Sequence, residues 1–133
     1  MGHMNTDPEH EELAAKAFDL ARAGDTDSLR SSLQAGVPPN LTNGKGDTLL
    51  MLAAYYGHAE TVRMLVACGA SPNRINDRGQ TPLAGAVFKN ESAVVRALLD
   101  ADADPEVGRP SAMDTARMFA NEQFIQWFTQ RAS

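Results

Sequence analysis

The 133-residue sequence has few features that could cross-link the chain or anchor it in a membrane. Cys68 is its single cysteine, which excludes an intrachain disulfide and a cysteine metal cluster. No apolar run approaches the roughly 18 residues that a membrane-spanning helix needs. The acidic N-terminal stretch lacks the basic and apolar segments of a secretory signal. We therefore expect a cytoplasmic protein that has no membrane span and is stabilised by packing.

Positive charge is also scarce. Seventeen Asp and Glu residues outnumber twelve Lys and Arg residues, which leaves a formal charge of -5. This is the wrong sign for a protein that holds nucleic acid through phosphate contacts. We expect no nucleic-acid partner, and the net charge favours a partner protein with a basic surface.

Residue patterns typical of catalysis or metal binding are missing. His58 and Cys68 are ten residues apart, which corresponds to about 15 Å along a helix and is too far for a catalytic dyad. The alternating carboxylates of residues 100–104 resemble a calcium loop, but Pro105 and Ser111 stand where that loop requires glycine and glutamate. The sequence predicts no enzyme, no metal site and no cofactor.

The sequence repeats with a period of about 33 residues. A shift by one period places residues 48–57 on residues 81–90, and the same shift places residues 21–40 on residues 54–73. A further unit begins near Ser111, which follows its equivalent Thr81 sooner than a full period would place it, so its linking loop is shorter. Residues 1–3 have the features of a cloning scar. We expect one domain over residues 4–133, with units at about 8–40, 41–73, 74–106 and 107–133.

Each unit has the signals of two short helices and a projecting loop. Thr81 and Pro82 are typical of a helix start, because the hydroxyl caps the helix and proline loses nothing at the first position. The helix is expected to stop near Asn90, at the position of Gly24 and Gly57, which suit a left-handed turn. Apolar residues at helical spacing follow, and stretches rich in Asn and Gly separate the units.

These motifs resemble the ankyrin repeat, in particular the Gly-Gln-Thr-Pro-Leu segment at 79–83, Ala-Ala at 53–54, Gly-His at 57–58 and Gly-Ala at 69–70. The known repeat has the same period of about 33 residues and a Thr-Pro-Leu-His-x-Ala signature. The resemblance, to small stand-alone bacterial-type ankyrin proteins, implies an all-α solenoid of about four helix-turn-helix units with projecting β-turn loops. It also implies a concave face, lined by the loops and the first helices, that binds another protein.

The candidate partner-binding residues follow from that implied concave face. Tyr55 and Tyr56 are adjacent on a helix and diverge, so at least one of them is expected to face outward. Aromatic, Met and Arg side chains on a rigid face are typical of interfaces, although the same side chains could instead pack in the core. The candidates are Asn43, Lys45, Asp47, Asp77, Arg78 and Gln80 on the loops, and Tyr55, Tyr56, Phe88, Lys89, Met118 and Phe119 near the ends of the first helices.

The sequence is compatible with three functions. The leading hypothesis is a monomeric, non-catalytic adaptor or inhibitor that regulates a partner protein. A second is a self-assembling structural protein, because Phe124, Ile125, Trp127 and Phe128 cannot all point inward from one helix. A third is a small-ligand or enzymatic role in the groove.

Overall fold

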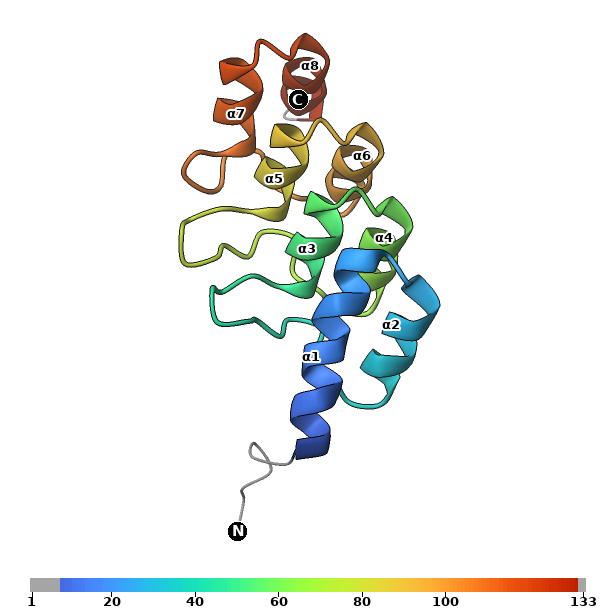
Figure 1. Ribbon diagram of the computed structural model, residues 1–133. Coiled ribbons are helices and arrows are strands. Elements are labelled where there is room, and N and C mark those ends of the chain that lie inside the picture. Colours follow the sequence, from blue (N-terminus) through green and yellow to red (C-terminus); the bar gives the residue numbers. More distant parts are fainter. Residues whose placement is uncertain (1–7, 132–133) are drawn as a thin grey trace.

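A computed structural model describes residues 8–131, although not the side chains of residues 8–10 and 131. The expected cloning scar lies outside the described residues. The described part contains isolated β-bridges, Thr42 with Thr48 and Gly108 with Ser111, and no β-strand. Its helices, shown in Figure 1, are α1 (Pro8–Ala23), α2 (Thr26–Gln34), α3 (Leu49–Tyr55), α4 (Ala59–Ala67), α5 (Pro82–Phe88), α6 (Ser92–Asp100), α7 (Ala112–Met118) and α8 (Glu122–Arg131).

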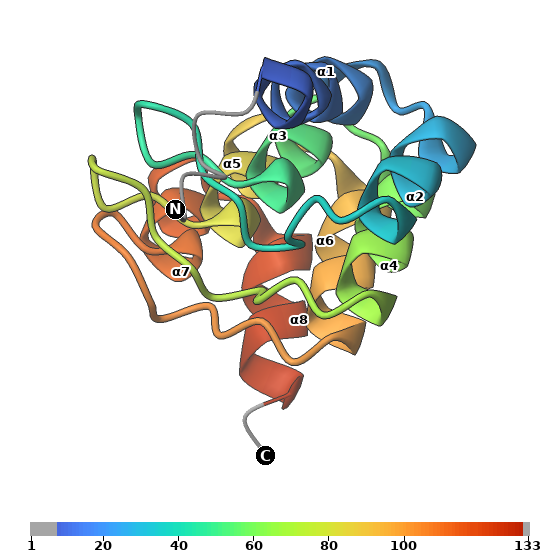
Figure 2. The ribbon, with the colours of Figure 1, turned by 90° about the horizontal axis from the view of Figure 1, so that it is seen from below.

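The helices form two layers. Helices α1, α3, α5 and α7 pack side by side in one layer, and α2, α4 and α6 pack side by side in the other, as Figure 2 shows. Helix α8 packs on α7 at the end of the stack. The loops that join one helix pair to the next project from the side of the odd-numbered helices. The predicted all-α solenoid of about four helix-turn-helix units is confirmed.

Hydroxyl side chains begin the first helices of the later units, as the sequence predicts. The Oγ1 atoms of Thr48 and Thr81 each accept a hydrogen bond of 3.1 Å, from the backbone N–H groups of Met51 and Ala84. These hydroxyls satisfy N–H groups that have no partner within the helix. Ser111 and Asp114 form a reciprocal capping box. Helices α3, α5 and α7 therefore each start directly after the projecting loop that precedes them.

Left-handed residues end the first helices and begin the turn to the second. Gly24, Gly57 and Asn90 have φ values of 74°, 84° and 59°, which confirms the predicted helix stops. Ala120 takes the equivalent place in the last unit with φ of 53°. At Gly24 a side chain is also excluded by the ring of His58, which a Cβ atom would overlap. The same His58 bonds through Nε2 to the carbonyl oxygen of Arg22 at 2.7 Å and makes no side-chain cap.

The core between the layers consists mainly of alanine and aliphatic side chains. Ala53 and Ala54 of α3 and Ala86 of α5 are fully buried. In α1, Ala17 and Ala21 face this core. No described helix combines the length and apolarity that crossing a membrane requires.

The aromatic residues of α8 lie mostly inside the protein. Phe124 and Phe128 are buried, and Ile125 and Trp127 are half-buried against the core. The guanidinium of Arg96 lies over the Trp127 ring, 4.1 Å from its centroid. The surface expected from the apolar residues of α8 is therefore limited to parts of Ile125 and Trp127.

Candidate partner-binding groove

One asparagine organises each of the two longer projecting loops. The Oδ1 atom of Asn43 accepts hydrogen bonds from the backbone N–H groups of Lys45 (2.9 Å) and Asp47 (3.0 Å). Asn76, one repeat period later, accepts the same pair of bonds, from Arg78 (2.9 Å) and Gln80 (3.0 Å). Side-chain bonds of this kind fix a turn locally. The backbone at both loop tips is therefore set before any partner arrives.

The two loops are also bonded to each other. The Nδ2 group of Asn76 donates to Asp47 Oδ1 at 2.8 Å and to Gln80 Oε1 at 2.9 Å, and the Asp77 N–H donates to the Lys45 carbonyl at 3.2 Å. Asp47, predicted as a partner contact, thus also holds the two loops together, and Gln80, another predicted contact, holds Asn76 within its own loop. Asn76 was missing from the predicted set, although it follows Asn43 by one repeat period and the repeat could have identified it.

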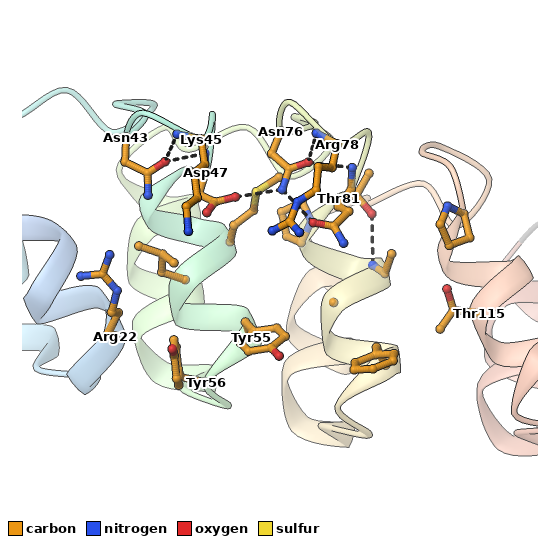
Figure 3. A pocket seen from close by; sticks show the side chains of 18 of the residues that line it. Arg22, Asn43, Lys45, Asp47, Tyr55, Tyr56, Asn76, Arg78, Thr81 and Thr115 are labelled. Atoms are coloured by element: carbon orange, nitrogen blue, oxygen red, sulfur yellow. Dashed lines mark hydrogen bonds between the residues drawn. The ribbon is translucent and has the colours of Figure 1, made fainter.

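Aromatic side chains lie at the opposite ends of the same helices. Tyr55, Tyr56 and Phe88 are 40%, 50% and 58% exposed. Tyr55 lies on the side of α3 that faces α5, and Tyr56 on the side that faces Arg22 of α1, as Figure 3 shows. The two tyrosine rings meet edge to face at 5.4 Å between centroids, and Lys89 Nζ lies 4.9 Å from the Tyr55 centroid.

A groove of about 680 Å³ extends between the loops and these aromatic rings (Figure 3). Unpredicted lining residues include Arg22, Leu52, Gly85 and Thr115. Arg22 precedes Tyr55 by one repeat period, so the repeat register could have identified it. Of the predicted residues, Asn43, Lys45, Asp47, Tyr55, Tyr56, Arg78, Gln80 and Phe88 line the groove, whereas Asp77, Lys89, Met118 and Phe119 do not.

The charge of the groove is opposite to that of the whole chain. Among the described residues that line it, Arg22, Lys45 and Arg78 are cationic and Asp47 alone is anionic. Arg22 pairs with Asp19 at 2.9 Å. Lys45 and Arg78 have no ion-pair partner within the described part of the chain. Lys45 and Arg78 therefore present two unpaired positive charges to the groove, whereas the exposed carboxylate of Asp77 at the same loop tips lies outside the groove lining.

The other sequence candidates have structural contacts of their own. Asp100 pairs with Arg63 at 3.1 Å, and Asp104 accepts a bond of 2.9 Å from the backbone of Glu106. Asp102 has φ of 67°, which places it in a left-handed turn. No cluster of three or more His, Cys, Asp or Glu side chains suited to a metal ion occurs in the described residues.

Comparison with known proteins gives the family. A family model for ankyrin repeats in three copies matches residues 17–108, more than half of the chain. A curated protein of Pseudomonas aeruginosa, named as an ankyrin repeat protein, is 56% identical over 54 residues, which are 41% of this chain and 32% of that protein. The match thus spans about a third of the relative. Ankyrin repeats are in general protein–protein interaction modules. This chain belongs to the ankyrin repeat family.

Proposed function

We propose that the protein is a non-catalytic recognition module that binds one partner protein in the groove and so serves as an adaptor or as an inhibitor of that partner. The observation that carries this proposal is the set of exposed rings of Tyr55, Tyr56 and Phe88 at one end of a groove whose other end is fixed by bonded loops. We further propose that the protein is a cytoplasmic monomer.

The rigidity of the groove supports binding in physical terms. The asparagine bonds within and between the loops order the backbone in the free protein, so association loses little further conformational freedom. Tyr and Phe side chains have few rotatable bonds and a large apolar area, and such residues dominate the free energy of many interfaces. The groove therefore combines low ordering cost with strong contact residues.

The test compares a groove variant with a matched control. Tyr55→Ala/Phe88→Ala removes two lining rings, whereas Ile75→Ala removes an exposed apolar side chain that does not line the groove. Proteins retained from a native lysate are identified by mass spectrometry, and the affinity of each purified candidate is then measured by calorimetry. We expect the double variant to lose about 2–4 kcal/mol of binding free energy and Ile75→Ala to bind as the wild type does.

Two results would contradict this proposal. A partner that binds the double variant as tightly as the wild type would place recognition outside the groove. Self-association that Trp127→Ala abolishes would favour the structural alternative, for which the half-buried Trp127 provides the remaining surface. Circular dichroism of every variant shows whether the helical content is unchanged.

A further inference from the structure

The groove presents a positive end and an apolar end to the same occupant. We propose that this occupant is an extended acidic segment of the partner protein, with carboxylates at Lys45 and Arg78 and an apolar side chain over Gly85. The inference rests on the proposed function and specifies the chemistry of the partner.

The cations at the loop tips differ from those on the second helix layer. On that layer, Arg30 pairs with Asp27 at 2.9 Å and Arg63 pairs with Asp100 at 3.1 Å. Lys45 and Arg78 are exposed, lie on adjacent loops and have no ion-pair partner among the described residues. A carboxylate placed there would gain a charge-assisted contact without breaking one that already exists.

The floor of the groove is open at Gly85. This glycine lies in the middle of α5, where the preceding unit has Leu52, and both residues line the groove. A Cβ atom at position 85 would lie 3.7 Å from Cδ1 of Tyr55, within ordinary van der Waals contact. Phe88 follows one helical turn later on the same face. The missing side chain leaves a hollow beside the Tyr55 and Phe88 rings that an apolar anchor of the partner fills.

The length of the groove indicates an extended occupant. Its lining includes one residue each from α1 and α7, Arg22 and Thr115, besides several from α3 and α5. Four adjacent helices separated by about 10 Å each span about 30 Å. An extended chain covers this distance with about nine residues. A short linear segment can therefore reach both the loop tips and the rings.

The local charge selects an acidic peptide over both a basic partner and a nucleic acid. The formal charge of -5 acts at a distance and is screened beyond about 10 Å, whereas the lining side chains touch the occupant directly. We therefore replace the basic partner surface expected from net charge with an acidic one. A groove that holds both cations and aromatic rings also suits single-stranded nucleic acid, but the two cations Lys45 and Arg78 match a few carboxylates better than a run of phosphates.

The experiment selects peptides from a displayed random library of about 12 residues, a length that can span the groove. Wild-type protein is compared with Lys45→Glu/Arg78→Glu. The control is Lys16→Glu/Arg74→Glu, which makes the same change in net charge at exposed residues outside the groove. We expect the wild type and the control to enrich peptides with Asp or Glu and one large apolar residue. The groove variant should bind these peptides about tenfold or more weakly.

A second variant tests the apolar end. Gly85→Ala fills the hollow and is compatible with the helix, since Gly85 is not among the residues with positive φ. We expect the selected peptides to bind it about tenfold more weakly, while its thermal midpoint stays equal to or above that of the wild type. Unchanged affinity for Gly85→Ala would overturn the placement of the anchor.

The remaining outcomes separate this inference from the proposed function. Enriched peptides that are basic or uncharged, and that Tyr55→Ala/Phe88→Ala no longer binds, would overturn the acidic chemistry but leave groove recognition intact. If Lys45→Glu/Arg78→Glu and Tyr55→Ala/Phe88→Ala both bind the selected peptides as tightly as the wild type does, both proposals are overturned. Failure to enrich any peptide, or tighter binding of a thymidine oligonucleotide of about 12 bases than of any peptide, would overturn the acidic segment as the occupant.

Discussion

Two aromatic clusters have similar patterns in the sequence and opposite positions in the structure. Tyr55, Tyr56 and Phe88 are exposed in or beside the groove, whereas Phe124 and Phe128 of α8 are buried, at 0% and 2% exposure. In both clusters large aromatic residues stand next to other apolar residues on short helices. The type of residue therefore does not decide burial here.

The position of each residue on its helix explains the difference. Tyr55 and Phe88 are the last residues of α3 and α5, just before the turns, where no further helix of the second layer covers them. Phe124 and Phe128 are one turn apart in α8 and both point at the core. The first cluster is thus free for recognition, and the second closes the stack.

The largest expected effect comes from breaking the buried cluster. Phe124→Ala removes a fully buried ring and should lower the free energy of unfolding by about 3–5 kcal/mol. Phe88→Ala, the same change at a ring that is 58% exposed, should cost far less. Urea denaturation of both variants measures the difference. Phe124→Leu keeps most of the buried volume and gives an intermediate value if Phe124→Ala does not fold. Equal losses of unfolding free energy in Phe88→Ala and Phe124→Ala would show that the two clusters contribute equally to stability.

The sequence predicted the fold more completely than the groove. Thr81 with Pro82 identified a helix start, and the reduced spacing from Thr81 to Ser111 identified a shorter last loop, because these features depend on local chemistry and on the repeat. The unpaired state of the cations at the loop tips could not be predicted, because an ion-pair partner can come from a neighbouring unit of the folded chain. Arg63 forms an ion pair with Asp100 of the next unit, whereas Lys45 has no ion-pair partner among the described residues.

Ala120 joins the exposed end of α7 to the buried cluster of α8. Its φ of 53° is left-handed, a conformation that costs a non-glycine residue about 1–2 kcal/mol. Ala120→Gly should therefore raise the free energy of unfolding by about 0.5–1 kcal/mol, after the greater freedom of glycine in the unfolded chain is deducted. Ala15→Gly, on the exposed face of α1, should lower it by about 1 kcal/mol. Both variants are measured by thermal denaturation. If both substitutions raise the free energy of unfolding, or both lower it, the strain at Ala120 is contradicted.

Arg96 lies over one face of the half-buried Trp127 ring. Its guanidinium lies 4.1 Å from the ring centroid, and Arg96→Ala should cost about 0.5–1 kcal/mol. Trp127 is the single tryptophan of the chain, so its fluorescence reports this site directly. We expect a shift of the emission maximum to longer wavelength, because water reaches the ring. Arg63→Ala, at the equivalent place on α4, should leave the emission unchanged, and a shift in both variants would show that the Arg96 contact does not protect Trp127.

The smallest effect is expected at Met118, which follows Phe88 in the repeat register and is 68% exposed. Met118→Ala should change the free energy of unfolding by less than about 0.5 kcal/mol, since an exposed side chain loses little packing. Because Met118 does not line the groove, partner affinity should also change less than about twofold. Parallel calorimetry on Met118→Ala and Phe88→Ala tests whether recognition on α7 is limited to the groove lining at Thr115. A loss of affinity at position 118 as large as at position 88 would extend the recognition surface along α7, from Thr115 to the exposed end of that helix beside the buried cluster of α8.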